Sequence, residues 1–392
     1  MRIAINAYEA NVVSKVGSNQ YAYQILCELE KLTKKNRDDV LVYLPSYPLP
    51  DMPKERKGWS YQIVGPKHLW SITGLPRALW LEKVKHNNID VVLSLGHYAP
   101  FYTPFPSVVC VMDLAFLKFP EYFTKRDLIQ LRTWSDWSIR HAAKLIAISE
   151  STKKDLITEY SLKKDLIRVA YPGYSKQKVT KAASFEKLKK KMKLSSSYLV
   201  YVGTIQPRKN LERLLKAFEK IAQHKENKDL QLVMAGKNGW MNEGFEKELK
   251  NSKVKDRIIL TGFIDESEKY LLIKNAKALV LVGLFEGFGI PALEALSCGT
   301  LPVVSNTSSL PEVIGKAGIL VDPYDEVSIA RGLKKALAIT PEQHKLFRKH
   351  ATMQIQNFSW KNSAQEVYNV LKTFSKEEKK IERTYAAVAV QR

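Results

Sequence analysis

The sequence predicts an α/β protein made of two doubly wound domains, each a parallel sheet with helices on both faces. Three observations support this prediction. The chain has 392 residues, which is more than one ordinary hydrophobic core accommodates. Short apolar runs alternate with longer stretches of helical pattern, as in proteins whose crossover helices cover a parallel sheet. These runs form two series, with a lysine-rich segment between them.

Twelve runs rich in Val, Ile and Leu are predicted to be strands. In the first half they span 2–7, 40–44, 90–95, 107–112, 144–149 and 167–171. In the second half they span 198–203, 230–236, 257–262, 278–283, 301–305 and 318–322. Each run is short and almost continuously apolar, which is typical of a strand buried on both faces.

The two series set the predicted domain boundaries. The first domain covers 1–175 and the second covers 198–357. A helix over 358–375 is expected to cross back to the first domain. Residues 376–392 lack a sustained amphipathic period, so we expect a flexible tail.

Between the domains, 176–197 is predicted to be a basic linker, a hinge followed by a short exposed helix. Residues 176–193 contain eight lysines and one glutamate. Such a run is either a solvated linker or an electrostatic contact with a membrane or an anionic substrate.

The composition favours anionic partners and a reducing compartment. Lys and Arg number 62 against 40 Asp and Glu, a net charge of +22. This charge suits phosphates, nucleic acid or an acidic membrane surface. The three cysteines, Cys27, Cys110 and Cys298, lie far apart, and neither a disulfide framework nor a zinc site is indicated. Without a signal-peptide pattern or a long apolar run, the expected location is the cytoplasm.

A first candidate site follows the strand at 198–203. Arg208 and Lys209 stand just before a helix that Asn210 could cap, with Leu211, Leu214, Leu215 and Phe218 at helical spacing. Ligands of open parallel sheets bind beyond the carboxyl ends of the strands. Two cations beside a helix N-terminus therefore form a site for a diphosphate, unless they are ordinary surface residues.

A second candidate site follows the strand at 278–283. The stretch EGFGIPALE places Glu286 in a loop, Gly289 before a predicted helix, Pro291 in its first turn and Glu294 inside it. Glycine lets a ligand approach the backbone closely. Two carboxylates could then accept hydrogen bonds from the hydroxyls of a nucleotide sugar. The alternative is one capping glutamate and one surface glutamate.

The same stretch resembles the E-x7-E signature of family-4 retaining glycosyltransferases of the GT-B fold. The resemblance continues in the segments 169–174, 201–218 and 308–325, and in AISESTKKDL and ILTGFIDESE. The segment DLAFLKFPEYF at 113–123 is similar, more loosely, to the acceptor domain of bacterial surface-polysaccharide mannosyltransferases. The family implies two Rossmann-like domains that face each other across a cleft.

The resemblance also implies roles for the residues that match. Lys209, with Arg208 beside it, would neutralise the donor diphosphate, Glu286 would contact the transferred sugar and Glu294 would hold the ribose. The remaining donor contacts would come from backbone groups of Phe288, Gly289 and Ile290 around the sugar and phosphate, from Gly262, Phe263 and Ile264 beside the base, and from Gly17, before a helix beginning near Ser18.

Three positions depart from the family pattern. Met112 precedes Asp113 where the family often has His before Asp, and His97 could occupy the vacated space or be a structural histidine. Thr204 stands where many relatives have a second phosphate-binding arginine. Ser18 follows Gly17 in place of a second glycine. Altered donor choice or lower activity is therefore an open expectation.

The expected activity is transfer of a hexose, with mannose from GDP-mannose as the first choice, to a glycan or lipid-linked acceptor in surface-polysaccharide synthesis. No D-x-D motif occurs, so neither a metal nor a cofactor is expected. Front-face transfer with retention is the expected mechanism. The alternatives are a nucleotide-sugar epimerase of the same fold and a non-catalytic protein that binds anionic ligands or nucleic acid. Nucleic acid is not an expected partner of the enzyme. The positive charge fits either peripheral attachment to an anionic membrane surface, at the inner face of the cell membrane, or affinity for the donor diphosphate, and the sequence does not separate the two.

Overall fold

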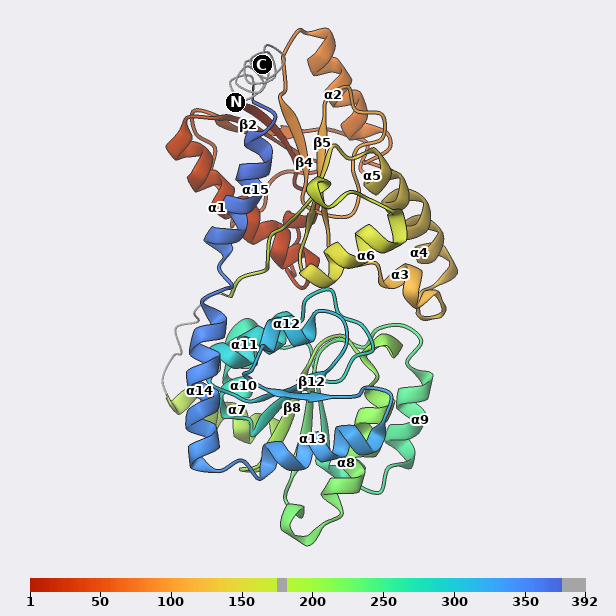
Figure 1. The fold of residues 1–392 in the computed structure, drawn as a ribbon, viewed down its shortest axis with the longest axis vertical. Helices are drawn as coiled ribbons and strands as arrows, with labels where there is room; N and C mark the ends of the chain where they lie inside the picture. Colours follow the sequence, from red (N-terminus) through yellow and green to blue (C-terminus); the bar gives the residue numbers. More distant parts are fainter. Residues whose placement is uncertain (175–181, 376–392) are drawn as a thin grey trace, which may run out of the picture. The chain divides into compact units, whose positions relative to one another are not determined.

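The computed structural model describes residues 1–174 and 182–375, and the chain divides into two compact units (Figure 1). Unit 1 contains Met1–Lys118, Phe123–Gly173 and the segment that begins at Ser359. Unit 2 contains Phe119–Tyr122 and Tyr174–Phe358. The predicted tail at 376–392 and the first part of the predicted linker lie outside the described residues.

Unit 1 is built on a seven-stranded parallel sheet in the order β3-β2-β1-β4-β5-β6-β7. Its strands are β1 (Arg2–Asn6), β2 (Asp39–Leu44), β3 (Trp59–Ile63), β4 (Val91–Ser94), β5 (Ser107–Val111), β6 (Lys144–Ala147) and β7 (Ile167–Val169). Six of them match the predicted runs to within two residues at each end.

The sequence analysis missed β3, and its composition explains why. Its residues, WSYQI, mix polar and apolar side chains, and only Trp59 is fully buried. The strand lies at the edge of the sheet and pairs only with β2. An edge strand that is partly solvated does not need the continuous apolar run that identified the others.

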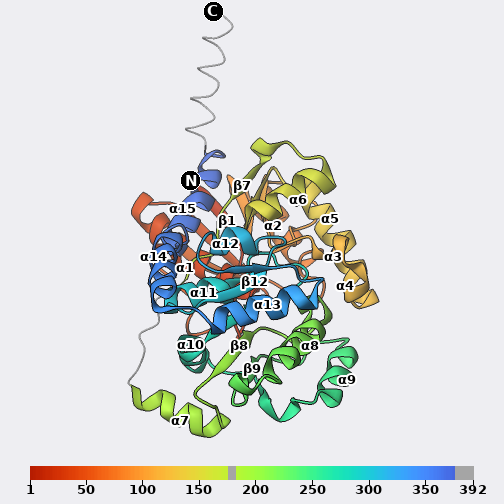
Figure 2. The ribbon, with the colours of Figure 1, turned by 60° about the horizontal axis from the view of Figure 1, so that its bottom comes forward.

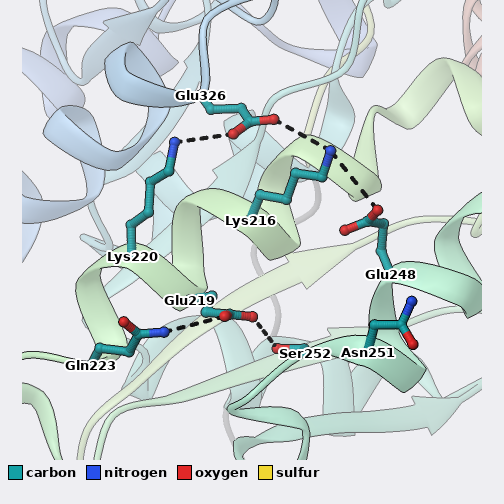
Figure 3. A pocket seen from close by; sticks show the side chains of 8 residues that line it. All are labelled: Lys216, Glu219, Lys220, Gln223, Glu248, Asn251, Ser252 and Glu326. Atoms are coloured by element: carbon teal, nitrogen blue, oxygen red, sulfur yellow. Dashed lines mark hydrogen bonds and ion pairs between the residues drawn. The ribbon is translucent and has the colours of Figure 1, made fainter.

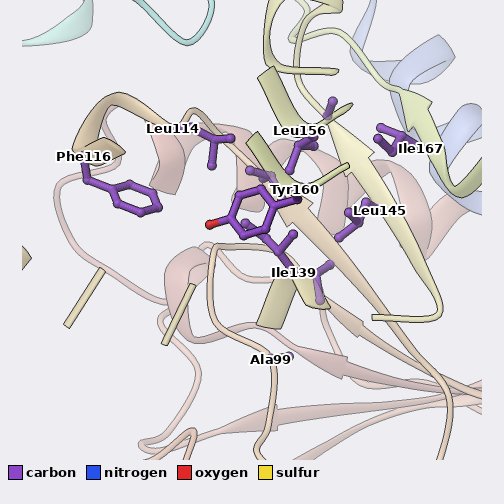
Figure 4. Close-up of a cluster of buried hydrophobic side chains, with 11 residues drawn as sticks. Ala99, Leu114, Phe116, Ile139, Leu145, Leu156, Tyr160 and Ile167 are labelled. Atoms are coloured by element: carbon purple, nitrogen blue, oxygen red, sulfur yellow. The ribbon is translucent and has the colours of Figure 1, made fainter. Parts of the chain in front are cut away.

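Helices and buried side chains cover both faces of this sheet. The helices of unit 1 are α1 (Ser18–Asn36), α2 (Gly74–Val84), α3 (Ala115–Lys118), α4 (Lys125–Gln130), α5 (Asp136–His141), α6 (Glu150–Tyr160) and α15 (Trp360–Lys372). A π-helical turn, Leu131–Ser135, joins α4 to α5. One buried cluster packs α5 and α6 against β5, β6 and β7 through residues such as Ile139, Leu145 and Leu156 (Figure 4).

Unit 2 is built on a six-stranded parallel sheet in the order β10-β9-β8-β11-β12-β13. Its strands are β8 (Tyr198–Val202), β9 (Gln231–Ala235), β10 (Ile258–Gly262), β11 (Ala278–Leu281), β12 (Pro302–Ser305) and β13 (Ile319–Val321). All six were predicted to within two residues at each end. The predicted fold class, two doubly wound α/β domains, is therefore confirmed.

The helices of unit 2 fall into two groups, and the helices within each group contact one another. Two groups are expected because the right-handed crossover connections change direction between β10 and β11. One group is α8 (Leu211–Ala222), α9 (Glu243–Asn251) and α13 (Glu326–Leu337). The other is α7 (Ala182–Met192), α10 (Glu266–Asn275), α11 (Ile290–Cys298), α12 (Leu310–Ile314) and α14 (Pro341–Ile355). Figure 2 shows α7, which falls within the predicted basic linker, next to α10.

Each sheet reverses its strand order beside its first strand. In unit 1 the chain moves outward from β1 to β3 and then returns to β4, on the other side of β1. In unit 2 it moves from β8 to β10 and returns to β11. Loops diverge where the order reverses, and the resulting crevice at the carboxyl ends of the strands is the usual ligand site of such sheets.

The C-terminal helix α15 belongs to unit 1, where it packs along α1 (Figure 1). The rings of Trp360 and Tyr21 meet edge to face at 6.0 Å between centroids. The hydroxyl of Tyr368 donates a 2.6 Å hydrogen bond to Asp38, a buried carboxylate between α1 and β2. Burial raises the pKa of Tyr368, and the adjacent carboxylate raises it further.

None of the helices within 1–174 and 182–375 combines the length and the apolar character that crossing a bilayer requires.

The hydrogen bond between Tyr368 and Asp38 gives a first prediction. Tyr368→Phe removes a donor from a buried carboxylate, and we expect the free energy of unfolding to fall by about 1.5–3 kcal/mol. Urea denaturation followed by circular dichroism measures this loss. The control is Tyr47→Phe, at an exposed residue, which should unfold like the wild type. Equal stability of all three proteins would contradict the assigned role of α15.

Candidate active site

Two cations follow β8 at the point where the strand order of unit 2 reverses. Arg208 and Lys209 belong to a 3₁₀ turn, Pro207–Lys209, directly before α8. The ammonium nitrogen of Lys209 lies 2.8 and 2.7 Å from the two carboxylate oxygens of Glu286. The guanidinium of Arg208 donates to the carbonyl oxygen of Phe285 and lies 3.9 Å from Glu286 Oε2. The turn after β8 thus meets the loop after β11.

Backbone and side-chain hydrogen bonds hold Glu286 in this position, where it is only 8% exposed. Its backbone N–H donates to the Ser308 hydroxyl at 2.9 Å, and its carbonyl accepts from the Ser309 hydroxyl at 2.8 Å. A Cβ atom on Gly283 would lie 2.9 Å from Glu286 Oε1. The carboxylate therefore has a defined place against the backbone, and glycine at 283 leaves room for it.

Asn210 lies at the N-cap position of α8, but the prediction that its side chain caps the helix is wrong. Asn210 occupies the N-cap position but has left-handed backbone angles, and its side chain makes no capping hydrogen bond. Its amide nitrogen donates to the carbonyl oxygens of Val282 and Pro323, at 2.9 and 2.7 Å. Buried carbonyls beyond β11 and β13 need a donor, and this need outweighs a local cap that water could replace. Asn210 thus joins three loops at the carboxyl ends of the strands.

The loop after β11 ends at the N-terminus of α11. Gly289 has φ +95°, a left-handed angle that a residue with a Cβ adopts only with strain. A Cβ there would also lie 2.5 Å from Leu310. Ile290 begins the helix and Pro291 follows in its first turn, as predicted. Phe288 is buried and its ring meets Phe358 edge to face at 5.4 Å.

Glu294, the fifth residue of α11, pairs with a lysine of α10. The ammonium nitrogen of Lys269 lies 2.7 Å from Glu294 Oε1 and 2.9 Å from a carboxylate oxygen of Glu266. Glu294 Oε2 is buried and has no hydrogen-bond partner among the described residues. One oxygen of this carboxylate is therefore held by the protein, while the other keeps its accepting capacity.

The environment shifts the pKa values of both partners. Burial raises the pKa of Glu294, and the positive charge of Lys269 opposes that rise. Burial by itself would lower the pKa of Lys269, but the carboxylates of Glu294 and Glu266 outweigh it and raise the pKa. The lysine therefore stays charged and limits the cost of an ionised Glu294.

The residues predicted to flank a base lie at the end of β10. Gly262 has φ +66°, and no atom would lie within 4 Å of a Cβ there. Phe263 is exposed, with the Lys237 ammonium 4.9 Å above its ring. A surface pocket of about 330 Å³ is lined by Phe263 and Ile264 together with the C-terminal end of α7.

Three further predicted residues lie in unit 1, at the carboxyl ends of its strands. Gly17 occupies the N-cap position of α1 with φ +55° and open space at its Cβ position. His97 follows β4, and its Nδ1 is buried without a hydrogen-bond partner among the described residues. Burial lowers the pKa of His97, and Asp113, which follows β5, partly opposes that shift. Asp113 accepts a 3.0 Å hydrogen bond from the backbone of Ala115.

Another surface pocket of unit 2, of about 370 Å³, contains none of the predicted site residues (Figure 3). In it Lys216 and Lys220 of α8 form ion pairs with Glu326 of α13. Lys216 lies in the middle of α8 and Lys220 in its last turn, away from the N-terminus of the helix that follows Lys209. The pocket is a charged seam between helices. Within 1–174 and 182–375, no three His, Cys, Asp or Glu side chains gather as a metal site would require.

The sequence analysis missed several residues that build this site. Ser308 and Ser309 lie in a segment that carried the family resemblance, so their importance could have been inferred, but not their bonds to Glu286. Lys269 gave no signal, because a lysine three residues after a glutamate on an exposed helix predicts only a local ion pair. Its contact with Glu294 depends on how α10 packs against α11.

Both halves of the chain match family models of glycosyltransferases. Residues 183–353 match a family model described as "Glycosyl transferases group 1". Residues 17–178 match one described as "Glycosyltransferase Family 4". The two segments together span most of the chain.

Similar proteins include two mannosyltransferases of Escherichia coli. The O-antigen chain mannosyltransferase B is 27% identical over 285 residues, which are 70% of this chain and 73% of that protein. The serotype-specific mannosyltransferase WbdA is 30% identical over 233 residues. That match covers 56% of this chain and 27% of WbdA, so the chain spans about a quarter of this longer relative.

A solved structure extends the similarity to the whole fold. The Anabaena protein HepE, in complex with UDP-glucose, superposes with a TM-score of 0.71 at 17% identity. The match covers 95% of this chain and 100% of that one. At this identity the likeness shows a shared fold.

The Glu294–Lys269 pair gives a second prediction, on pH dependence. In Lys269→Met, burial of Glu294 remains while the opposing positive charge is lost, so the pKa of Glu294 rises further above its unfolded value. Such a carboxyl favours folding most at low pH, and this contribution is lost as the pH rises through the folded pKa. We expect a loss of about 1–3 kcal/mol of unfolding free energy at neutral pH that shrinks as the pH falls.

Urea denaturation of wild type and variant at a series of pH values measures this difference. Lys274→Met, at an exposed lysine of the same helix, is the matched control and should show no pH-dependent loss. A loss in Lys269→Met that does not vary with pH would show that the ion pair does not control the charge of Glu294.

Proposed function

Because this chain is a family-4 glycosyltransferase of the GT-B fold, similar to polysaccharide mannosyltransferases, we propose that it transfers mannose from GDP-mannose to a glycan or lipid-linked acceptor. The acceptor would belong to a surface polysaccharide under synthesis. The names of the E. coli relatives support mannose as the donor sugar and a polysaccharide as the product.

The observation that carries this proposal is the contact of Lys209 and Arg208 with the Glu286 loop. Cations after β8 and a carboxylate after β11 meet at the place where an open parallel sheet binds its ligand. A nucleotide sugar has the complementary chemistry, since a diphosphate needs cations and a hexose presents hydroxyl donors. Lys209 and Arg208 would bind the diphosphate, and Glu286 would accept from hydroxyls of the sugar.

The rest of the donor would extend along unit 2. Backbone groups of Phe288, Gly289 and Ile290, at the N-terminus of α11, would bind the sugar and phosphate. Glu294 would accept from the ribose hydroxyls, and its unpartnered Oε2 supports this role. The base would lie against Gly262, Phe263 and Ile264. The exposed ring of Phe263 offers a surface on which the base could stack.

The reaction would break the bond between the anomeric carbon and the diphosphate oxygen and form a bond from that carbon to an acceptor hydroxyl. The acceptor proton would pass to the departing phosphate oxygen on the same face of the sugar, which retains the configuration. Lys209 and Arg208 would stabilise the charge that develops on the diphosphate. No metal is required in this scheme, because the two side-chain cations supply the positive charge.

Residues of unit 1 would bind the acceptor and the near side of the donor. The neutral form that burial favours for His97 leaves its Nδ1 able to donate or accept a hydrogen bond, depending on the tautomer. Asp113 lies close enough to influence the pKa of that ring. His97 would therefore contact the sugar in place of the histidine that Met112 replaces. Gly17 would let the N-terminus of α1 approach the diphosphate.

The comparisons do not favour the other two interpretations of the sequence. Both family models describe glycosyltransferases, and the similar mannosyltransferases are transferases by name. We therefore do not propose an epimerase or a non-catalytic anion-binding protein.

A third prediction concerns leaving-group stabilisation. Lys209→Met should lower kcat by about 10²–10³, because it removes a charge that stabilises the departing diphosphate. The matched control is Lys216→Met on the following helix α8, whose ion pairs lie in the charged seam and whose loss should leave kcat unchanged. Initial rates at saturating donor measure the effect. A Lys209→Met enzyme with wild-type kcat would contradict the assigned role.

A fourth prediction identifies donor and stereochemistry. Among GDP-mannose, UDP-glucose and other nucleotide sugars, GDP-mannose should raise the thermal unfolding midpoint most, since ligand binding stabilises the native state. NMR of the product should then show an α-mannosyl linkage, with the configuration of the donor retained. A larger shift with UDP-glucose would reject GDP-mannose as the donor, and a β-linked product would reject retention. Release of a free epimerised nucleotide sugar, without transfer to an acceptor, would reject the transferase reaction.

A further inference from the structure

The solvent-facing side of α2 in unit 1 is apolar, although nothing in the described structure covers it. Trp80, Leu81 and Val84 project from one face of this helix, with Trp80 50% exposed and Val84 69% exposed. The opposite face, with Leu75 and Leu79, packs into the core. A helix with a single buried face normally carries polar residues on its outer side. These three residues therefore need an explanation outside the core of unit 1.

A row of aromatic rings continues this surface away from α2. Trp80 Nε1 donates a 2.7 Å hydrogen bond to the carbonyl oxygen of Tyr102, a residue that is 74% exposed. The Tyr102 ring meets Trp137 of α5 edge to face at 5.6 Å, and Trp137 stacks on Phe101 at 4.2 Å and on His141 at 4.5 Å. We call Trp80, Leu81, Val84, Phe101, Tyr102, Trp137 and His141 the aromatic strip. Figure 1 shows α2 and α5, which carry most of it, as neighbours.

The strip has a fixed shape before any partner binds. The rings of Phe101, Tyr102, Trp137 and His141 contact one another, and a hydrogen bond fixes Trp80, so these side chains have little freedom left to lose. The only indole donor of Trp80 is already bonded to a backbone carbonyl, so this ring can enter an apolar layer without losing a hydrogen bond to water. Trp80, Leu81, Val84 and Tyr102 are exposed, whereas Phe101 and Trp137 are partly buried behind them. Exposed apolar side chains grouped in this way mark an interaction site in a native protein.

Positive charge lies beside the α2 part of the strip, whereas at the α5 end Asp136 is paired with Arg140. Among residues 77–86 the exposed charged side chains are Arg77, Lys83 and Lys85, all cationic. The single acid in this stretch, Glu82, is partly buried and faces Arg2 at 3.7 Å. Lys83 also lies 5.9 Å from the ring of Phe105. The partner of the strip must therefore be apolar in its middle and negative at its margin.

We propose that the aromatic strip is a docking surface for an anionic phospholipid membrane. Trp and Tyr side chains settle at the boundary between lipid headgroups and acyl chains, and aliphatic side chains beside them enter the acyl region. Lysine and arginine at the margin bind anionic headgroups. A glycan would use the rings but not Leu81 and Val84, and the net charge of +22 opposes close approach of a second copy.

The position of the strip has a consequence for the proposed acceptor. Phe101 and Tyr102 lie in the segment between β4 and β5 that also carries His97. A membrane bound to the strip would hold this segment near the lipid surface, where a lipid-linked acceptor could reach the strand ends of unit 1. This consequence depends on the proposed function, whereas the docking itself does not.

Flotation of the full chain with lipid vesicles tests the docking. The wild type should float with phosphatidylglycerol-containing vesicles and much less with phosphatidylcholine alone. Trp80→Ser combined with Val84→Ser should weaken binding roughly 100-fold, as expected when two apolar side chains leave the interface. The control is Leu346→Ser combined with Met353→Ser, which removes two equally exposed apolar residues from α14 and should bind like the wild type.

A second variant tests the charge without altering the apolar residues. Lys83→Gln combined with Lys85→Gln should weaken binding to anionic vesicles roughly 25-fold at low salt, and the difference from wild type should shrink as salt increases. Thermal unfolding and the thermal shift produced by the donor confirm that each variant is folded.

The alternatives give distinct results. The proposal is overturned if the strip variant (Trp80→Ser with Val84→Ser) floats as well as the α14 control (Leu346→Ser with Met353→Ser). It is also overturned if the wild type binds neither kind of vesicle. A wild-type dimer in sedimentation velocity that the strip variant dissociates, without vesicle binding, would assign the strip to a second copy. If the Trp80→Ser, Val84→Ser variant no longer floats but the donor still raises its thermal unfolding midpoint as in the wild type, the result supports membrane docking independently of glycosyl transfer.

Discussion

The candidate site of unit 2 depends on the hydrogen bonds that join the turn after β8 to the loop after β11. The backbone N–H of Leu284 donates to the carbonyl of Arg208 at 2.9 Å, and Asn210 donates to Val282. These bonds span the reversal of strand order, where crossover connections diverge and leave polar backbone groups without sheet partners. Satisfying those groups brings Lys209 and Arg208 to Glu286, so the chemistry of the site follows from a requirement of the fold.

In unit 2 two partly or fully buried carboxylates each form an ion pair with a lysine, and the two pairs differ in geometry. Both carboxylate oxygens of Glu286 accept from Lys209, whereas in Glu294 one oxygen accepts from Lys269 and the other has no partner among the described residues. A buried carboxylate without a cation would be costly to keep ionised. The first pair places a cation and a hydrogen-bond acceptor at one point, and the second leaves one carboxylate oxygen of Glu294 able to accept a hydrogen bond. This difference matches the separate parts of a nucleotide sugar that we propose they bind.

Unit 1 combines two kinds of surface within a short stretch of chain. The segment after β4 carries His97, a partly buried histidine whose pKa is lowered by burial, and then Phe101 and Tyr102, which belong to the aromatic strip. The His97 Nδ1 is shielded from water, whereas the Tyr102 ring is exposed and Phe101 is partly buried. If this segment both contacts the acceptor and docks on a membrane, as we propose, the position of the membrane would be linked to the acceptor side of the reaction.

The sequence by itself determined the fold class and twelve of the thirteen strands in the described part of the chain, because buried parallel strands require continuous apolar runs. It also singled out cations and carboxylates at strand ends as candidates for the site that we propose. It could not show β3, whose partly solvated residues have no such run, or the aromatic strip, whose rings come from α2, α5 and the loop between β4 and β5. It also missed Lys269 and the true partners of Asn210. These depend on contacts between residues distant in sequence, and only the packing of helices and loops against the sheets decides which side chains meet.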